Sequence, residues 1–209
     1  MIKLLEAELF RHQLKARMPF RYGIATMTEV PHVFLRLKFD FDGAVQRGVS
    51  ADHLPPKWFT KDPQRGLEDE INEMLLVIRM AVSHAQAISA KTPFAFWRQL
   101  YAAQASWAAD NNLPPLLAQF GVTLVERALI DATCRHEGTT LASALHKNTL
   151  GIDLGESHPS RAGSLPGEWL PAQPPTEVFA RHTVGLSDAL TDAEIPDEEH
   201  VEDGLPQSL

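Results

Sequence analysis

The chain has 209 residues, of which 44% are hydrophobic and 22% are charged. This composition is that of a soluble globular protein and excludes a disordered or membrane-embedded chain. The formal net charge of −8 argues against a nucleic-acid-binding protein, because phosphate neutralisation needs a basic face.

The excess negative charge lies at the C-terminal end. Residues 1–181 hold equal numbers of acidic and basic residues, whereas residues 182–209 hold eight acidic residues and no Lys or Arg. No stretch approaches the ~20 apolar residues of a membrane span, and acidic residues interrupt what would be the apolar part of a signal peptide. The single cysteine, Cys134, rules out an intrachain disulfide and fits a reducing compartment. We therefore expect a cytoplasmic protein with no membrane or nucleic-acid partner.

The first fifty residues predict a three-stranded antiparallel meander. Residues 32–40 alternate between apolar and polar side chains, the period of a strand with one buried face. Asp42-Gly43 predicts a tight turn into a returning strand at residues 44–50, and residues 2–15 make a third strand.

The segment between the first two strands, residues 18–31, is predicted to be a long loop. It contains Pro19, Gly23 and Pro31, which are unfavourable inside a regular element. Long loops that carry aromatic side chains often act as ligand lids, so this loop is a candidate binding element. The alternative is a loop that folds onto its own core through Phe20.

From residue 67 the apolar residues recur at spacings of three and four, which predicts helices. The first covers residues 67–85, and the second begins at Pro93. Thr123 and Glu126 match a capping box and so place the start of a third helix at Thr123, with Gly138 as its end. Residues 1–150 thus predict an α+β unit, a meander followed by a helical bundle.

The remaining residues have a different character. Residues 151–177 are rich in Pro and Gly and are interpreted as a connection. Residues 178–186 look like a short strand. The acidic residues 197–203 are expected to be solvated rather than to form a divalent-ion site, because nothing fixes an oxygen cage there.

Familiar catalytic motifs are missing from this sequence: it contains no dinucleotide-binding, P-loop, zincin or C-x-x-C pattern. Cys134 is interpreted as a buried, inert thiol. Arg36 and Lys38 share one strand face, where solvent exposure is the more common role of such cations.

Three motifs nevertheless follow one another in a recognisable order. They are Pro19-Phe20-Arg21-Tyr22-Gly23, Val33-Phe34-Leu35-Arg36-Leu37 and Val125-Glu126-Arg127-Ala128-Leu129-Ile130-Asp131-Ala132. In this order they resemble the N-terminal capping domain of the enolase superfamily, and in particular its mandelate racemase and muconate lactonizing branch. The resemblance assigns residues 1–150 to the capping domain, residues 151–177 to a connection, and residues 178–209 to the first strand of an incomplete (β/α) barrel.

The resemblance implies an activity for a complete parent enzyme. Members of this superfamily remove a proton α to a carboxylate with the help of Mg²⁺, so the parent would be a lyase or isomerase: a dehydratase, racemase, epimerase or cycloisomerase acting on a small carboxylate such as a sugar acid or another hydroxy acid. The family's metal ligands and base lie on later barrel strands, for which this sequence has no matching positions. We therefore expect no catalytic residue and no metal ligand in this chain, no bound Mg²⁺, and no activity of the chain alone.

Two segments match family positions that close over the barrel mouth and contact the substrate. They are residues 19–28 and 50–54, and the substrate-contacting residues that they imply are Phe20, Tyr22, Ile24, Asp52 and His53. Relatives commonly form homo-oligomers, and the sequence leaves the oligomeric state of this chain open. The competing hypothesis is a non-catalytic α+β module that binds a small ligand or a partner protein.

Overall fold

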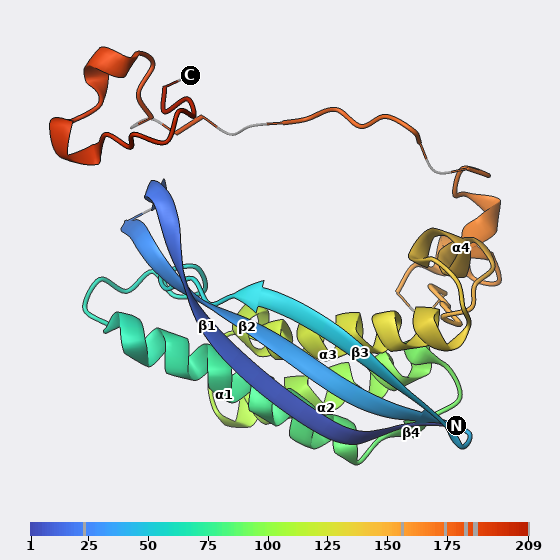
Figure 1. The fold of residues 1–209 in the computed structure, drawn as a ribbon. Helices are drawn as coiled ribbons and strands as arrows, with labels where there is room; N and C mark the ends of the chain where they lie inside the picture. The colour runs from blue at the N-terminus through green and yellow to red at the C-terminus, as the bar shows by residue number, and fades with distance from the viewer. Residues whose placement is uncertain (23, 156, 174, 182–183, 186–187, 209) are drawn as a thin grey trace.

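The structure is a computed structural model that describes residues 1–22, 24–155, 157–173, 175–181, 184–185 and 188–208. It is an α+β fold in which helices cover one face of a four-stranded antiparallel sheet (Figure 1). The strand order is β3-β2-β1-β4. The chain then runs through a long irregular stretch and returns to the far end of the sheet (Figure 1).

The predicted meander is confirmed, with longer strands than expected. The strands are β1 (Ile2–Tyr22), β2 (Ala25–Phe41), β3 (Ala44–His53) and β4 (Ser89–Ala90). Positive φ angles at Asp42 and Gly43 form the turn between β2 and β3. The short strand β4, which the sequence did not predict, pairs with the start of β1.

The predicted loop at residues 18–31 is wrong. β1 and β2 continue through it as a hairpin, with Phe20 opposite Met27. Pro19 is tolerated because it lies in the irregularity between Lys15 and Phe20, on a part of β1 that has no second neighbour, and proline is confined to edges and bulges of sheets. Pro31 similarly lies just beyond the last pairing of β2 with β3. Gly23 lies outside the described residues.

The helices are α1 (Leu67–Gln86), α2 (Pro93–Asp110), α3 (Pro115–His136) and α4 (Leu141–His146). The first two lie where the periodicity predicts them, and Gly138 follows α3 with a φ of +59°, as expected for a helix end. The short α4 was not predicted.

The predicted start of the third helix at Thr123 is wrong, because α3 begins earlier, at Pro115. The Thr123 hydroxyl lies inside the helix and donates to the carbonyl oxygen of Phe120 at 2.8 Å. Proline suits the first turn of a helix because its missing N–H would have no partner there, so Pro114 and Pro115 mark the true start.

The two faces of the sheet differ in chemistry. On β2, Val33, Leu35, Leu37 and Phe39 are almost fully buried against the helices. The intervening side chains lie on the open face, where Arg36 forms two hydrogen bonds with Glu8 and Lys38 pairs with Glu6. The alternation that predicted one buried face is therefore confirmed.

Residues 151–208 contain no strand in their described parts. The strand predicted over residues 178–186, and with it the start of a barrel, is not confirmed. Residues 182, 183 and 186 of that segment lie outside the described residues. Four short 3-10 helices occur instead: Pro159–Arg161, Pro166–Glu168, Asp192–Glu194 and Asp197–Glu199. Among the helices described, none has the length and apolar character needed to cross a membrane.

Candidate substrate pocket

A cavity of about 470 Å³ opens where three elements meet. The β1–β2 hairpin, the end of β3 with the segment after it, and the first turns of α3 each supply part of its wall. We call it the Phe20 pocket. Its lining residues, in chain order, are Phe20, Met27, Asp52, His53, Pro55, Trp58, Phe59, Leu116, Gln119, Phe120 and Thr123.

Three of the five predicted contact residues lie in this lining. Phe20, Asp52 and His53 come together although they are separated by some thirty residues in the chain. Ile24 lies in the hairpin turn, 60% exposed, and is not part of the lining. The side chain of Tyr22 lies outside the described part of the structure.

Most of the apolar wall was missed by sequence reasoning. Trp58 and Phe59 lie in a Pro-rich irregular segment whose aromatic pair was the only available signal. Leu116 and Phe120 belong to the first turns of α3, which the misplaced helix start left out. The rings of Phe59 and Phe120 pack with their centroids 5.3 Å apart, so the two missed parts of the wall support each other.

A buried ion pair holds the segment that carries Trp58 and Phe59. Lys57 Nζ lies 2.7 Å from a carboxylate oxygen of Glu70, and the two side chains are 7% and 6% exposed. The other Glu70 oxygen accepts from the backbone N–H of Lys57, and Nζ also donates to the carbonyl oxygens of Asp62 and Arg65. Lys57 has a φ of +62°, a left-handed conformation that is uncommon for a side chain of this size. These bonds fix both the charge and the backbone of this side of the pocket.

Asp52 is held by α3. Arg127 Nη2 donates to Asp52 Oδ2 at 2.7 Å, and Nη1 donates to the carbonyl oxygen of Ala51 at 3.0 Å. The guanidinium group therefore ties the end of β3 to the helix and fixes the carboxylate at the pocket rim.

His53 forms an imidazole pair with His32 on the neighbouring strand. Their Nδ1 atoms lie 2.9 Å apart, so one ring donates and the other accepts, depending on the tautomer. Burial lowers the pKa of His32, and so do the neighbouring His53 and His12, against an opposing effect of Asp52. The lowered pKa favours the neutral form of His32, which suits the hydrogen bond that it shares with His53.

Gln119 is a polar residue of the lining. Its Oε1 is buried and accepts no hydrogen bond from any described residue. An unsatisfied buried acceptor costs about 1–3 kcal/mol.

The oxygen ligands that the pocket offers do not fit Mg²⁺. This ion needs several oxygen ligands in octahedral geometry, whereas Asp52 is the only carboxylate among the lining residues and already pairs with Arg127. Nowhere in the described parts of the chain do three or more His, Cys, Asp or Glu side chains gather in a way that could hold a metal ion.

Comparison with known proteins gives structural likeness only. A scan against protein-family models gives no match, and neither does a search of curated proteins. Among solved structures, the chain is similar to a mandelate racemase/muconate lactonizing enzyme-like protein from Rubrobacter xylanophilus, with 18% identity over 68% of this chain and 33% of that one and a TM-score of 0.45. It is also similar to an enolase with bound Mg from alpha proteobacterium bal199 (12% identity, 66% and 32% coverage, TM-score 0.44).

A third match is a mandelate racemase/muconate lactonizing enzyme from Bordetella bronchiseptica RB50, with 23% identity, 66% and 31% coverage and a TM-score of 0.40. These proteins bear the same family names that the sequence motifs indicated. The chain spans about a third of the length of these structures.

Proposed function

We propose that this chain supplies the substrate-contacting cap of an enzyme of the mandelate racemase and muconate lactonizing type. The observation that carries the proposal is the Phe20 pocket, in which Phe20 from one predicted contact segment meets Asp52 and His53 from the other. The order of the sequence motifs and the meander-plus-helix fold also support it. In the complete enzyme, a proton α to a carboxylate would be removed with Mg²⁺ by groups outside this pocket.

The chemistry of the pocket favours an apolar group on the substrate. Its wall is built mainly from aromatic and aliphatic side chains, and Asp52, His53, Gln119 and Thr123 are its polar residues. Ligand sites of this kind hold an apolar body and orient it through a few polar contacts. We therefore propose a carboxylate with an aromatic or branched aliphatic group, in preference to a polyhydroxylated sugar acid.

A binding experiment on the 209-residue chain tests this proposal. Phenylacetate and gluconate are titrated separately against the ¹⁵N-labelled chain, and amide chemical shifts are followed. We expect phenylacetate to shift resonances of the pocket residues and gluconate to leave them unchanged. Binding of gluconate alone, or of neither acid, would overturn the proposed substrate class.

Two phenylalanines of β1 provide a matched pair of variants. Phe20 is 57% exposed and lines the pocket, whereas Phe10 is 46% exposed and does not line it. Phe20→Ala should weaken phenylacetate binding by about tenfold, the equivalent of about 1.4 kcal/mol of lost apolar contact. Phe10→Ala should leave it unchanged, so an equal loss in both variants would contradict a role for the pocket.

The alternative is a non-catalytic module that uses the same pocket to bind a small ligand. Both hypotheses predict binding, and both predict that the chain alone does not exchange the α-proton of phenylacetate in D₂O with Mg²⁺ present. Robust exchange by the 209-residue chain would contradict the expectation that the catalytic groups lie elsewhere.

A further inference from the structure

The far end of the β1–β2 hairpin projects beyond the body of the molecule. β3 pairs with β2 only as far as His32, so residues 14–22 and 24–29 form a two-stranded ribbon that extends past the helices (Figure 1). We call these residues the hairpin tip. An isolated two-stranded ribbon is marginally stable at best in water, so further contacts are needed to hold the tip in place.

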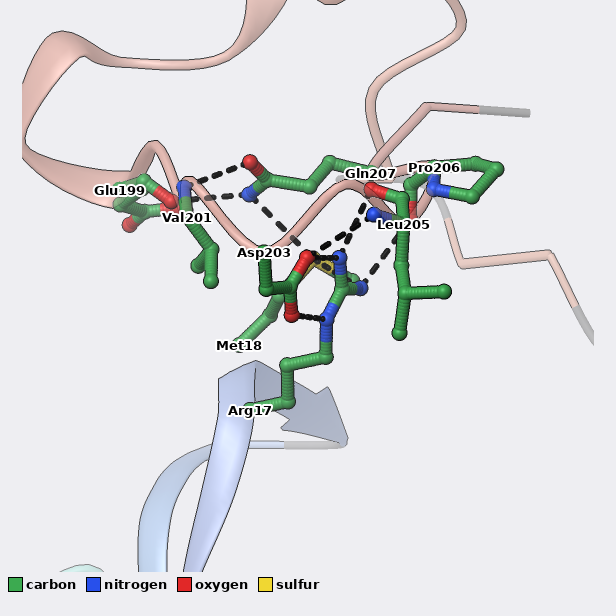
Figure 2. Close-up of polar contacts among 8 residues, drawn as sticks. All are labelled: Arg17, Met18, Glu199, Val201, Asp203, Leu205, Pro206 and Gln207. Carbon is green, nitrogen blue, oxygen red and sulfur yellow. Dashed lines mark hydrogen bonds and ion pairs between the residues drawn. The ribbon is translucent and has the colours of Figure 1, made fainter.

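Residues 188–208 supply such contacts, and we call them the clasp. Arg17 Nε and Nη2 donate to the two carboxylate oxygens of Asp203 at 2.6 and 2.7 Å. Nη2 also donates to the carbonyl oxygen of Leu205 at 2.8 Å, and Nη1 donates to that of Pro206 at 3.1 Å. Figure 2 shows the guanidinium group surrounded by these acceptors. Paired Arg–carboxylate bonds of this geometry are among the stronger and more specific polar contacts.

Hydrogen bonds within the clasp hold the groups that accept from Arg17. The N–H of Leu205 donates to Asp203 Oδ1 at 3.0 Å, which orients the carboxylate. The Gln207 side chain accepts from the N–H of Val201 and donates to the carbonyl oxygen of Glu199 (Figure 2). The acceptors for Arg17 are therefore arranged by bonds within the clasp itself.

A second ion pair and the charge distribution support the same docking. Arg21 Nη2 pairs with Glu199. The clasp contains all eight acidic residues of the C-terminal end and no Lys or Arg, whereas the hairpin tip carries Lys15, Arg17 and Arg21 against the single acidic residue Glu29. The two surfaces are complementary in charge, which favours their association.

We propose that the clasp binds the hairpin tip through Arg17 and Arg21 and thereby positions Phe20 in the wall of the Phe20 pocket. Phe20 lines this pocket and also a second cavity of about 490 Å³ between the tip and the clasp. It lies next to Arg21 in β1, so the segment that the clasp holds is the segment that places the ring. The effect on the pocket rests on the proposed function, whereas the docking itself does not.

The docking is tested by amide hydrogen exchange of the whole 209-residue chain, with protection of residues 33–39 in the core as the internal reference. Arg17→Gln removes the bonds of Arg17 to the clasp, and Lys15→Gln is the matched control because Lys15 pairs with Glu29 within the tip. We expect Arg17→Gln to lower protection of the tip by about tenfold and Lys15→Gln to leave it near the wild-type value. Unchanged protection in Arg17→Gln, or equal losses in both variants, would overturn the proposal.

A charge exchange tests the pairing directly. Arg17→Asp and Asp203→Arg should each release the tip, and the double variant should recover at least half of the lost protection because the opposite charges face each other again. Absence of recovery would overturn a direct contact between the two side chains.

The link to the pocket is tested with phenylacetate. If the clasp positions Phe20, the ligand should bind the Arg17→Gln chain about threefold or more weakly, whereas Lys15→Gln should bind it as the wild type does. Loss of tip protection with unchanged affinity would overturn the positioning of Phe20 and leave the docking intact. If phenylacetate does not bind the wild type, the proposed function fails while the exchange experiments still decide the docking.

Discussion

Two segments that line the Phe20 pocket are each held by an ion pair, and the two pairs are of different kinds. The Lys57–Glu70 pair, which holds the segment with Trp58, is 7% and 6% exposed. The Arg17–Asp203 pair, which holds the hairpin tip with Phe20, is 32% and 35% exposed. Buried pairs are little screened by salt, whereas exposed pairs are weakened by salt and by protonation. The pocket therefore has one wall that is fixed with the fold and one wall that responds to solution conditions.

The fixed wall should show the largest response to mutation. Glu70→Gln removes the charge while keeping the volume, and it leaves Lys57 buried without its partner. Breaking a buried pair in this way costs about 3–5 kcal/mol. We expect a loss of that size in urea unfolding, together with loss of the pocket. The control Glu68→Gln, on the same helix and 65% exposed, should change stability by less than about 0.5 kcal/mol; similar losses in both would show that the pair does not fix this wall.

The contact between α1 and α3 supports the same wall and gives the next prediction. A Cβ at Gly121, next to Phe120, would lie 2.2 Å from the carbonyl oxygen of Val77. Gly121→Ala should therefore push the helices apart and cost about 1–3 kcal/mol or more, measured by thermal unfolding. In Gly66→Ala the new methyl group meets only the flexible end of Asp69, and we expect a change within about 1 kcal/mol. A neutral Gly121→Ala would show that the helices yield at this point.

A smaller, pH-dependent effect is expected at Glu126, beside the arginine that holds Asp52. Burial raises the pKa of Glu126, against an opposing effect of Arg127. A carboxyl group whose pKa is raised by folding contributes stability below its unfolded pKa and loses it as the pH rises through the folded pKa. Glu126→Gln should therefore stabilise the protein at pH 7, on the order of 0.5 kcal/mol, and have no such effect at pH 4. Equal effects in denaturant unfolding at the two pH values would contradict this assignment.

Local patterns predicted the fixed part of the molecule well. The alternation of Leu35 and Leu37 with charged neighbours identified the buried face of β2, because a strand covered on one side must place apolar residues at every second position. Pro19 misled the interpretation, because the sequence does not reveal that β1 has a free edge at that position. Thr123 misled it too, because a hydroxyl that caps a helix and one that bonds within a helix look alike in sequence.

The site was only partly predictable because it depends on contacts that are distant in the chain. Phe20, Asp52 and His53 were named through the family resemblance, but the wall from α3 followed only from the packed structure. The partner of Arg17 is Asp203, 186 positions away in the chain. The sequence does not indicate which acidic residue near the C-terminus pairs with which basic residue. The Lys57–Glu70 pair that holds the fixed wall likewise joins residues of different elements, so local sequence pattern predicted the strands and helices but not the contacts that hold either wall.

The wall formed by the hairpin tip should respond to a fall in pH before the wall held by Lys57 and Glu70 does. The bond from Arg17, and then the N–H of Leu205, lower the pKa of Asp203 from 3.8 to about 2. Because folding lowers this pKa, the contribution of Asp203 to docking is complete above pH 3.8 and is lost as the pH falls toward 2. Exchange protection of the hairpin tip, corrected for intrinsic rates, should therefore fall across this range relative to that of residues 33–39. Asp203→Asn should show a poorly protected tip already at pH 6 and a smaller further fall with pH than the wild type, because, of the two ion pairs, only Arg21–Glu199 then remains. A tip that stays as protected as the core down to pH 2, or an Asp203→Asn chain that behaves like the wild type, would mean that apolar packing and not the carboxylate holds the tip, and the two walls would then be of one kind.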